Sequence, residues 1–289
     1  MKGNVSSQEP NILVYPVDID LDENGNLLIV DQYNHQVLEW TLATSTSTVV
    51  AGGNGPGNQT NQLNEPINLC IETKTDTLII CDFMNRRMVR WPRRDGANGE
   101  IIISKINCLG LAMDNIGFLY VSDYIRNEVK RYQIGDTEGI VIAGGNGKGN
   151  DLNQLNLPSY MFVDEDYSVY IADYENYRVM KWTKDAREGI IIAQGILHAK
   201  SMWQLSIPQG LFVDQLGTLY VSDFYNNRIV RWNNNASTFD FDIILGRSVR
   251  GDDSTHFNLA HTFIFDRYSN IYVADGGNAR IQWFLIERD

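Results

Sequence analysis

Several residue types that mark particular classes of protein are scarce in this chain. It has only three cysteines and four histidines among 289 residues. An odd cysteine count at irregular spacing is not a disulfide framework, so Cys70, Cys81 and Cys108 are expected to be buried thiols that act as small apolar side chains. The histidines do not recur in a pattern, and no two of them have metal-ligand spacing on one strand.

Long apolar runs and an excess of positive charge are missing too. No stretch of 18 apolar residues exists, so no transmembrane helix is expected, and the first residues show no apolar segment of a signal peptide. Lys and Arg number 24 against 36 Asp and Glu, a net charge of −12, which disfavours nucleic acid as a partner because phosphate binding needs a cationic surface. Sequons at Asn4, Asn58 and Asn235 allow an extracellular module and leave the compartment open.

What the chain does have is a repeat. An Asp recurs at intervals of 51, 41, 50, 50 and 52 residues, followed three residues later by Asn in five of the six copies and nine residues later by an aromatic residue. A period of roughly 40–50 residues is typical of a β-propeller with four strands in each unit. The marker residues are Asp31, Asp82, Asp123, Asp173, Asp223 and Asp275.

Each copy predicts four strands. An apolar strand a runs from a Pro to an acid, strand b ends at the marker Asp, strand c ends at the aromatic residue, and strand d is a β-branched run. No segment has a convincing helical period. The sequence therefore predicts an all-β chain: residues 1–289 form a single six-bladed β-propeller, with four-stranded antiparallel blades around a central channel.

The segment Pro208 to Trp232 resembles the NHL repeat, through Pro-x-Gly-Leu-Phe-Val-Asp, Gly-x-Leu-Tyr-Val-Ser-Asp and Asn-x-Arg-Ile-x-x-Trp. The resemblance extends from residue 11 to about residue 284. It implies a six-bladed propeller of a family whose members commonly bind proteins or RNA. Related six-bladed propellers include metal-dependent lyases and lactonases.

The sixth copy lacks a strand d in the expected place. An open sheet edge is a liability, so residues 1–10 are a candidate closing strand that pairs with strand c of the last blade. A three-stranded last blade, or a chain trimmed from a longer protein, remains an alternative. We expect a monomer unless the last blade is left open.

Function is expected where the copies differ, because the repeated Asp and Asn residues satisfy turn backbone groups and belong to the scaffold. The tips of the b–c turns differ and carry aromatic and amide side chains, which suit a protein, peptide or glycan ligand. The candidate ligand-binding residues are Tyr33, Asn34, His35, Met84, Arg86, Arg126, Tyr160, Tyr177 and Tyr225.

A second difference lies on strand a, where the first copy carries two acids. Asp18 with Asn68 is a candidate Ca²⁺ site in the central channel, because Ca²⁺ prefers carboxylate and amide oxygens; a hydrogen-bonded Asp in contact with channel water is the alternative. A metal-dependent lyase or lactonase would use the same region, with Asp20, Tyr160 and His261 as further candidates.

The leading hypothesis is a non-enzymatic recognition scaffold that binds a protein, peptide or glycan on the face of the b–c turns and d–a loops. The alternatives are the metal-dependent lyase or lactonase, and an RNA-binding NHL propeller, which the acidity disfavours.

Overall fold

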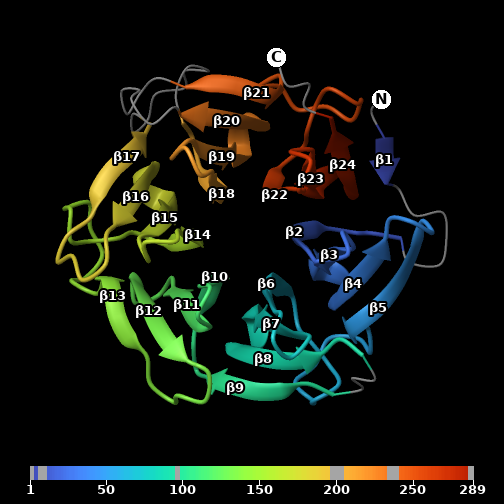
Figure 1. The fold of residues 1–289 in the computed structure, drawn as a ribbon, viewed down its shortest axis with the longest axis horizontal. Helices are drawn as coiled ribbons and strands as arrows, with labels where there is room; N and C mark the ends of the chain where they lie inside the picture. Colours follow the sequence, from blue (N-terminus) through green and yellow to red (C-terminus); the bar gives the residue numbers. More distant parts are fainter. Residues whose placement is uncertain (1–2, 6–11, 95–97, 196–204, 233–240, 286–289) are drawn as a thin grey trace. The chain divides into compact units, whose positions relative to one another are not determined.

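The computed structural model describes residues 3–5, 12–94, 98–195, 205–232 and 241–285. In this part of the chain the strands form six four-stranded antiparallel sheets, joined by turns that include five single-turn 3-10 helices (Figure 1). The chain is therefore a six-bladed β-propeller, which confirms the predicted fold class. The residues divide into two compact units.

The first unit holds blades one, two and six. The first two blades are simple meanders, in which each strand pairs with the next one along the chain. Their strands are β2 (Pro16–Leu21), β3 (Leu27–Asp31), β4 (Gln36–Thr41) and β5 (Thr46–Gly52), then β6 (Pro66–Glu72), β7 (Thr77–Asp82), β8 (Arg87–Pro92) and β9 (Glu100–Ser104).

Blade six takes its fourth strand from the N-terminus. Strand β1 (Gly3–Val5) pairs antiparallel with β24, with Gly3 opposite Trp283 and Val5 opposite Ile281. This is the place where the sequence suggests a closing strand. The other strands of this blade are β22 (Ala260–Phe265), β23 (Ile271–Asp275) and β24 (Arg280–Phe284).

The second unit holds blades three, four and five, all meanders. Blade three comprises β10 (Cys108–Met113), β11 (Phe118–Asp123), β12 (Glu128–Gln133) and β13 (Ile140–Gly144). Blade four comprises β14 (Pro158–Val163), β15 (Val169–Asp173), β16 (Arg178–Trp182) and β17 (Ile190–Gln194). Blade five comprises β18 (Pro208–Val213), β19 (Leu219–Asp223), β20 (Arg228–Trp232) and β21 (Asp242–Gly246).

The cores lie between neighbouring blades, which explains why the second strand of a blade is buried on both faces. Alternate residues of β3 and β4 enter different cores, because successive side chains of a strand point to opposite faces. Val30 and Val37 pack with β6 to β8 of blade two, whereas Ile29 and Leu38 pack with Tyr272 and other residues of blade six. In the second unit, Met180 and Trp182 pack against blade three, and Val179 packs against blade five.

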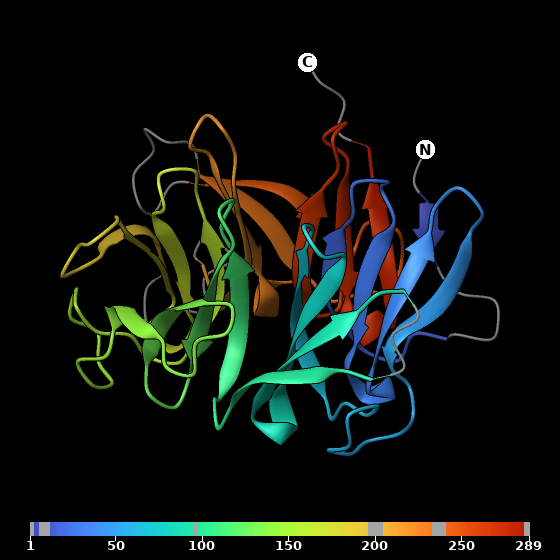
Figure 2. The same ribbon diagram turned by 60° about the horizontal axis from the view of Figure 1, so that its bottom comes forward.

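The turns and loops gather at the two ends of the strands, as the turned view in Figure 2 shows for each sheet. One end carries the b–c turns and the d–a loops, and the other carries the a–b and c–d turns. Within one blade, a b–c turn can therefore lie beside a d–a loop, and an a–b turn beside a c–d turn, but the two sets lie at opposite ends.

The cysteines depart from the expectation of three buried thiols. Cys70 is a buried free thiol, whereas Cys81 and Cys108 are disulfide-bonded. The prediction was wrong for these two residues because an odd count argues against a multi-bridge framework but is compatible with disulfide-bonded cysteines beside a free thiol. Disulfides persist mainly in oxidising compartments.

Candidate functional site

Each b–c turn follows one geometry. Four residues after the marker Asp, the chain enters the left-handed region, with φ between 51° and 54° in all six blades. In five blades the amide of this residue donates to the carbonyl three residues earlier, over 3.0 to 3.2 Å, and closes a 3-10 turn. The residue two after the Asp therefore stands at the tip of the turn.

The repeated polar residues of the turn hold the scaffold together, as blade four shows. Asp173 accepts hydrogen bonds from the Asn156 amide (2.7 Å), from Asn176 (2.8 Å) and from Nε of Arg178 (2.7 Å). Arg178 also donates to main-chain carbonyls of the preceding d–a loop. The equivalent residues Arg87 and Arg280 do the same in blades two and six.

These contacts confirm that the repeated Asp and Asn side chains belong to the scaffold. In blades two, four, five and six, the Arg pairs with the marker Asp of its own blade. The two residues face each other directly across strands b and c, as Asp173 and Arg178 do. The ion pair also ties the b–c turn to the d–a loop at the same end of the blade.

Two blades lack this buried pair. In blade one, Gln36 replaces the Arg and lies 3.5 Å from Asp31. In blade three, Arg126 reaches Asp123 at 3.6 Å with a side chain that is 58% exposed, and Glu128 pairs with Lys130 instead. These two turns therefore keep the left-handed backbone conformation without the buried ion pair.

Among the predicted ligand-binding residues, those at the tips are exposed. Tyr33, Met84 and Tyr225 each expose more than half of their surface, at 52%, 53% and 57%. Arg86 is exposed one position beyond a 3-10 turn. Ile125, at the tip of the blade-three turn, is 60% exposed and was not among the predicted residues.

The other predicted residues take part in the structure of the turns or of strand a. Asn34 donates to Asp31 and to the Ile12 carbonyl. His35 adopts the left-handed conformation, and its Nδ1 accepts the amide of Glu65 at 3.0 Å. Tyr177 occupies the same left-handed position in blade four and is half-buried, and Tyr160 is buried on β14.

An aromatic cluster that the sequence did not suggest lies in the first unit. Tyr33 stacks on Tyr15, with ring centroids 4.8 Å apart, and the Tyr15 ring meets His261 edge-on at 5.1 Å. Burial lowers the pKa of His261 to about 3, so its ring is neutral at physiological pH. The exposed Tyr33 therefore rests on a packed aromatic base.

The proposed metal ligands Asp18 and Asn68 are both buried, at 5% and 3% exposure. Asp18 accepts a hydrogen bond from the Leu69 amide at 2.9 Å. Burial raises the pKa of Asp18 well above its usual range, although the Leu69 amide favours the charged form. Among the described residues, no group of three or more His, Cys, Asp or Glu side chains is placed to hold a metal ion. The calcium site stays a prediction.

Asp20 gives a testable dependence of stability on pH. Burial raises its pKa to about 6, against opposing contributions from the Leu21 and Ile71 amides and from Arg93. Between about pH 4 and pH 6, Asp20 is protonated in the folded state but ionised in the unfolded state. Its contribution to the free energy of unfolding therefore falls as the pH rises through this range. The free energy of unfolding of Asp20→Asn, measured by urea unfolding, should rise by up to about 3 kcal/mol relative to that of the native chain between pH 4 and pH 7.

Asp22 is the matched control, because its pKa shifts in the opposite direction. Burial opposes its ionisation, but the hydrogen bonds that Arg93 and Asn26 donate to its carboxylate outweigh burial and lower its pKa. Its stabilising contribution is lost as pH falls, so Asp22→Asn should lose stability relative to the native chain as pH rises. If the difference in free energy of unfolding from the native chain changed with pH in the same way for both variants, the opposite pKa shifts of Asp20 and Asp22 would be contradicted.

A family comparison supports what the repeat indicates. The fold and its six copies of one turn define a β-propeller built from repeats, and the model of the NHL repeat matches residues 205–232, in blade five. The chain is thus a six-bladed propeller with an NHL repeat in blade five, and its other blades repeat the same b–c turn. A search of curated protein sequences finds no relative.

Solved structures share the fold at low sequence identity. An auxiliary nutrient binding protein from Bacteroides thetaiotaomicron has a TM-score of 0.75 and 16% identity, over 96% of this chain and 70% of its own. Virginiamycin B lyase from Staphylococcus aureus has a TM-score of 0.61 and 12% identity, over 100% of this chain and 89% of its own. A chain of a nidogen/laminin complex has a TM-score of 0.61 and 15% identity, with 76% of each chain covered. At these identities the likeness concerns the fold alone.

The described part of the chain contains no helix long and apolar enough to cross a membrane.

Proposed function

We propose that this propeller is a non-enzymatic recognition module that binds a peptide segment of a partner protein on the b–c turn tips of one of its two units. One observation carries the proposal. The tip position, two residues after the marker Asp, holds a large apolar side chain at 52–60% exposure in four of the six blades: Tyr33, Met84, Ile125 and Tyr225.

The surroundings of these side chains favour binding. A single exposed apolar side chain is common on a protein surface and needs no explanation. Here the same position of the repeat is apolar and exposed in four blades, which favours a shared binding role. Two of the four tips, Met84 and Tyr225, stand on turns held by a buried ion pair, at 2.6 Å between Arg87 and Asp82 and at 2.9 Å between Arg228 and Asp223. A ligand that docks on a rigid turn does not have to order it, which reduces the entropic cost of association. Tyr and Met are also frequent anchors in protein interfaces.

The experiment selects ligands and then maps them. A random peptide library displayed on phage is panned on the native chain, and the selected peptide is titrated against tip variants. Tyr33→Ser with Met84→Ser, and Ile125→Ser with Tyr225→Ser, remove the apolar tips of each unit separately. Loss of an apolar or aromatic anchor typically costs about 2–4 kcal/mol, so at least one pair should weaken binding by roughly thirtyfold or more.

The matched control lies at the other end of the same blades. Ile116 and Leu216 are exposed at 54% and 81% on a–b turns, and Ile116→Ser with Leu216→Ser removes equivalent apolar surface. This variant should bind the peptide as the native chain does. A peptide that needs Ile116 and Leu216 but tolerates both tip pairs would refute the proposal. The native chain and the tip variants are also tested on a glycan array. If only glycans bound in a way that depends on the tips, the ligand would be a glycan and not a peptide.

A lyase or lactonase with a metal in the channel remains the second candidate. Support comes from a virginiamycin B lyase of the same fold and from the two acids on β2 whose pKa values are raised by burial. Elemental analysis of the purified chain tests it. Stoichiometric calcium or zinc that is lost in Asp18→Ala with Asn68→Ala would favour the enzyme.

A further inference from the structure

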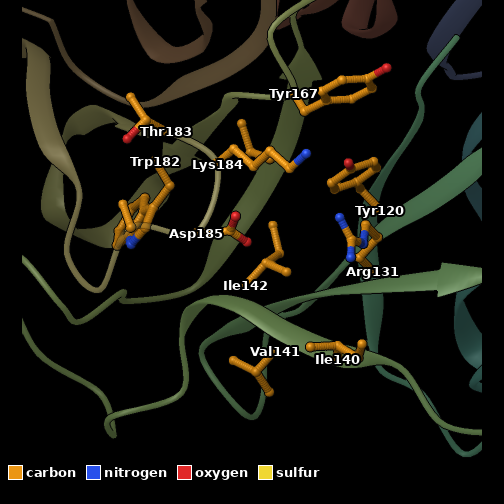
Figure 3. Close-up of a pocket in the computed structure, with 12 residues that line it drawn as sticks. Tyr120, Arg131, Ile140, Val141, Ile142, Tyr167, Trp182, Thr183, Lys184 and Asp185 are labelled. Carbon is orange, nitrogen blue, oxygen red and sulfur yellow. The ribbon is translucent and has the colours of Figure 1, made fainter.

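A pocket of about 240 Å³ lies between blades three and four of the second unit (Figure 3). It sits at the end of the a–b and c–d turns, away from the b–c tips. Figure 3 shows Arg131, Lys184 and Asp185 directed toward the space, with Tyr167 and Tyr120 beside it and Ile142 at its floor. The pocket thus combines two cations, one acid and aromatic surface.

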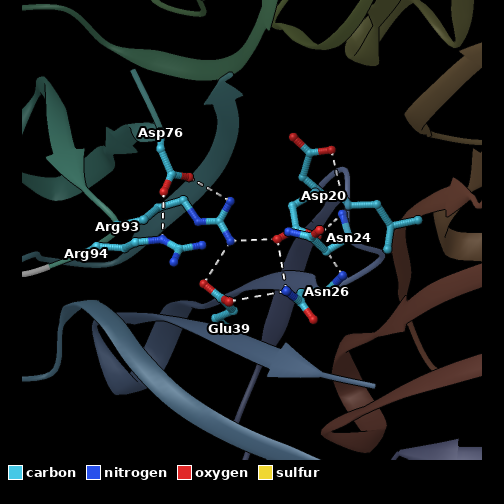
Figure 4. A network of polar contacts seen from close by, with 9 residues as sticks. Asp20, Asn24, Asn26, Glu39, Asp76, Arg93 and Arg94 are labelled. Carbon is cyan, nitrogen blue, oxygen red and sulfur yellow. Dashed lines mark hydrogen bonds and ion pairs between the residues drawn. The ribbon is translucent and has the colours of Figure 1, made fainter. Parts of the chain in front are cut away.

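The first unit has a comparable place between blades one and two, where the charges neutralise one another (Figure 4). The side chain of Arg93 is only 4% exposed and lies 2.8 Å from Asp22, 2.9 Å from Glu39 and 3.1 Å from Asp76. Asp76 also pairs with Arg94 at 3.0 Å. Every charged side chain of this network therefore lies within 3.1 Å of an opposite charge.

The two places are built from the same positions of the repeat. Counted from the marker Asp of each blade, Arg131 takes the position of Glu39, eight residues on, and Lys184 takes the position of Arg93, eleven residues on. Tyr167 takes the position of Asp76, six residues before. Two of the three carboxylates that neutralise Arg93 are therefore replaced, one by a cation and one by an aromatic ring.

The third carboxylate is already engaged. Asp114, the counterpart of Asp22, accepts the Tyr120 hydroxyl at 3.1 Å and three amides of its own turn. Arg131 lies over the Phe118 ring at 4.9 Å, and Lys184 lies over Tyr167 at 5.2 Å. Within the described ranges, none of Arg131, Lys184 and Asp185 takes part in an ion pair, so two cations share the pocket without a carboxylate bound to either.

Tyr167 is held in a conformation that its side chain does not favour. Its φ is 62°, and three other blades place glycine at this position: Gly25, Gly117 and Gly217. A bulky residue in the left-handed region costs free energy, and such strain persists most often at functional sites. The exchange of glycine for tyrosine adds an aromatic wall to this pocket.

We infer that the pocket binds an acidic sugar, with the sugar carboxylate between Arg131 and Lys184. The ring of the sugar packs against Tyr167 and Ile142, and its hydroxyl groups donate to Asp185, which would repel a simple anion. A volume of about 240 Å³ is smaller than the roughly 300–1,000 Å³ of sites for drug-sized ligands, which fits a single sugar ring. This site is separate from the b–c tips and does not depend on the proposed function.

The probe is glucuronate, with glucose and acetate as comparisons, in calorimetric titrations of the whole chain. Glucuronate should bind, and glucose and acetate should bind at least roughly tenfold more weakly, because each lacks one of the two recognised groups. Lys184→Gln should weaken glucuronate binding roughly tenfold. Arg94→Gln, in the other pocket, should leave it unchanged.

Arg131→Glu separates binding from folding. The new carboxylate would face Lys184 as Glu39 faces Arg93, so the melting temperature should hold while glucuronate binding is lost. Equal affinity for glucose would overturn the role of the carboxylate, and equal affinity for acetate would overturn the sugar. The absence of glucuronate binding at millimolar concentration, or its persistence in Arg131→Glu, would overturn the site.

Discussion

Arg178→Ala should lower the free energy of unfolding by about 3–5 kcal/mol, which is the usual cost of leaving one member of a buried ion pair unpaired. The side chains of Arg178 and Asp173 are 3% and 0% exposed, and their closest atoms lie 2.7 Å apart. The substitution also removes the donors to three carbonyls of the d–a loop. Urea unfolding monitored by tryptophan fluorescence measures the effect.

Arg126→Ala is the control, since Arg126 pairs with the marker Asp of its own blade in an exposed geometry. Its side chain is 58% exposed and 3.6 Å from Asp123. Exposed pairs contribute about 0–1 kcal/mol, so this variant should unfold almost as the native chain does. Similar losses in the two variants would show that the buried ion pair does not hold the turn.

Deletion of residues 1–9 should lower the melting temperature by several degrees and promote association. Three residues of β1 pair with β24, and their removal uncovers a sheet edge. At about 0.5–1.5 kcal/mol for each main-chain hydrogen bond, the loss is roughly 1–4 kcal/mol. Scanning calorimetry and light scattering of the shortened chain measure both effects.

A synthetic peptide of residues 1–9, added in excess, should restore the melting temperature, because binding to the folded state stabilises it by mass action. An unchanged melting temperature in the shortened chain would show that β1 does not close blade six.

The blades were predictable because their signal is repeated. The Asp of every b–c turn, with the Asn and Arg of most of them, stabilises one backbone geometry, as Asp173, Asn176 and Arg178 do, so these residues recur with the period of the fold. The closing strand was predictable only by elimination, since Gly3–Val5 carries no strand pattern of its own. The bonds of Cys81 and Cys108 were missed, because cysteine spacing says little about distance in a folded chain.

The candidate site was only partly accessible from sequence. The exposed tips follow from the turn, because the residue two after the Asp must stand outward. The roles of Asn34 and His35 do not follow from the sequence, because the residue type is the same whether the side chain binds a ligand or a backbone group. The pocket at Tyr167 has one signal in the sequence, a tyrosine where three other copies have glycine. The ion pairs around Arg93 that are absent from this pocket follow only from the folded structure.

The structure separates two kinds of residue in one turn. The buried polar residues are alike in most blades and fix the backbone, whereas the tips vary from Tyr33 to Met84 to Tyr225 and are exposed. A rigid frame with variable tips is the usual arrangement of a binding surface. The recognition proposal rests on this division, and the acidic-sugar site uses the opposite end of the blades.

Hydrogen exchange of the native chain, with and without a selected peptide, tests the recognition surface most directly. Protection is expected in the b–c turns and the d–a loops beside them, at residues 32–36, 83–87, 124–128 or 224–228, with the a–b turns unchanged. Protection confined to the a–b and c–d turns, at residues 22–26, 114–118 or 183–186, would contradict the placement of the partner on the b–c tips.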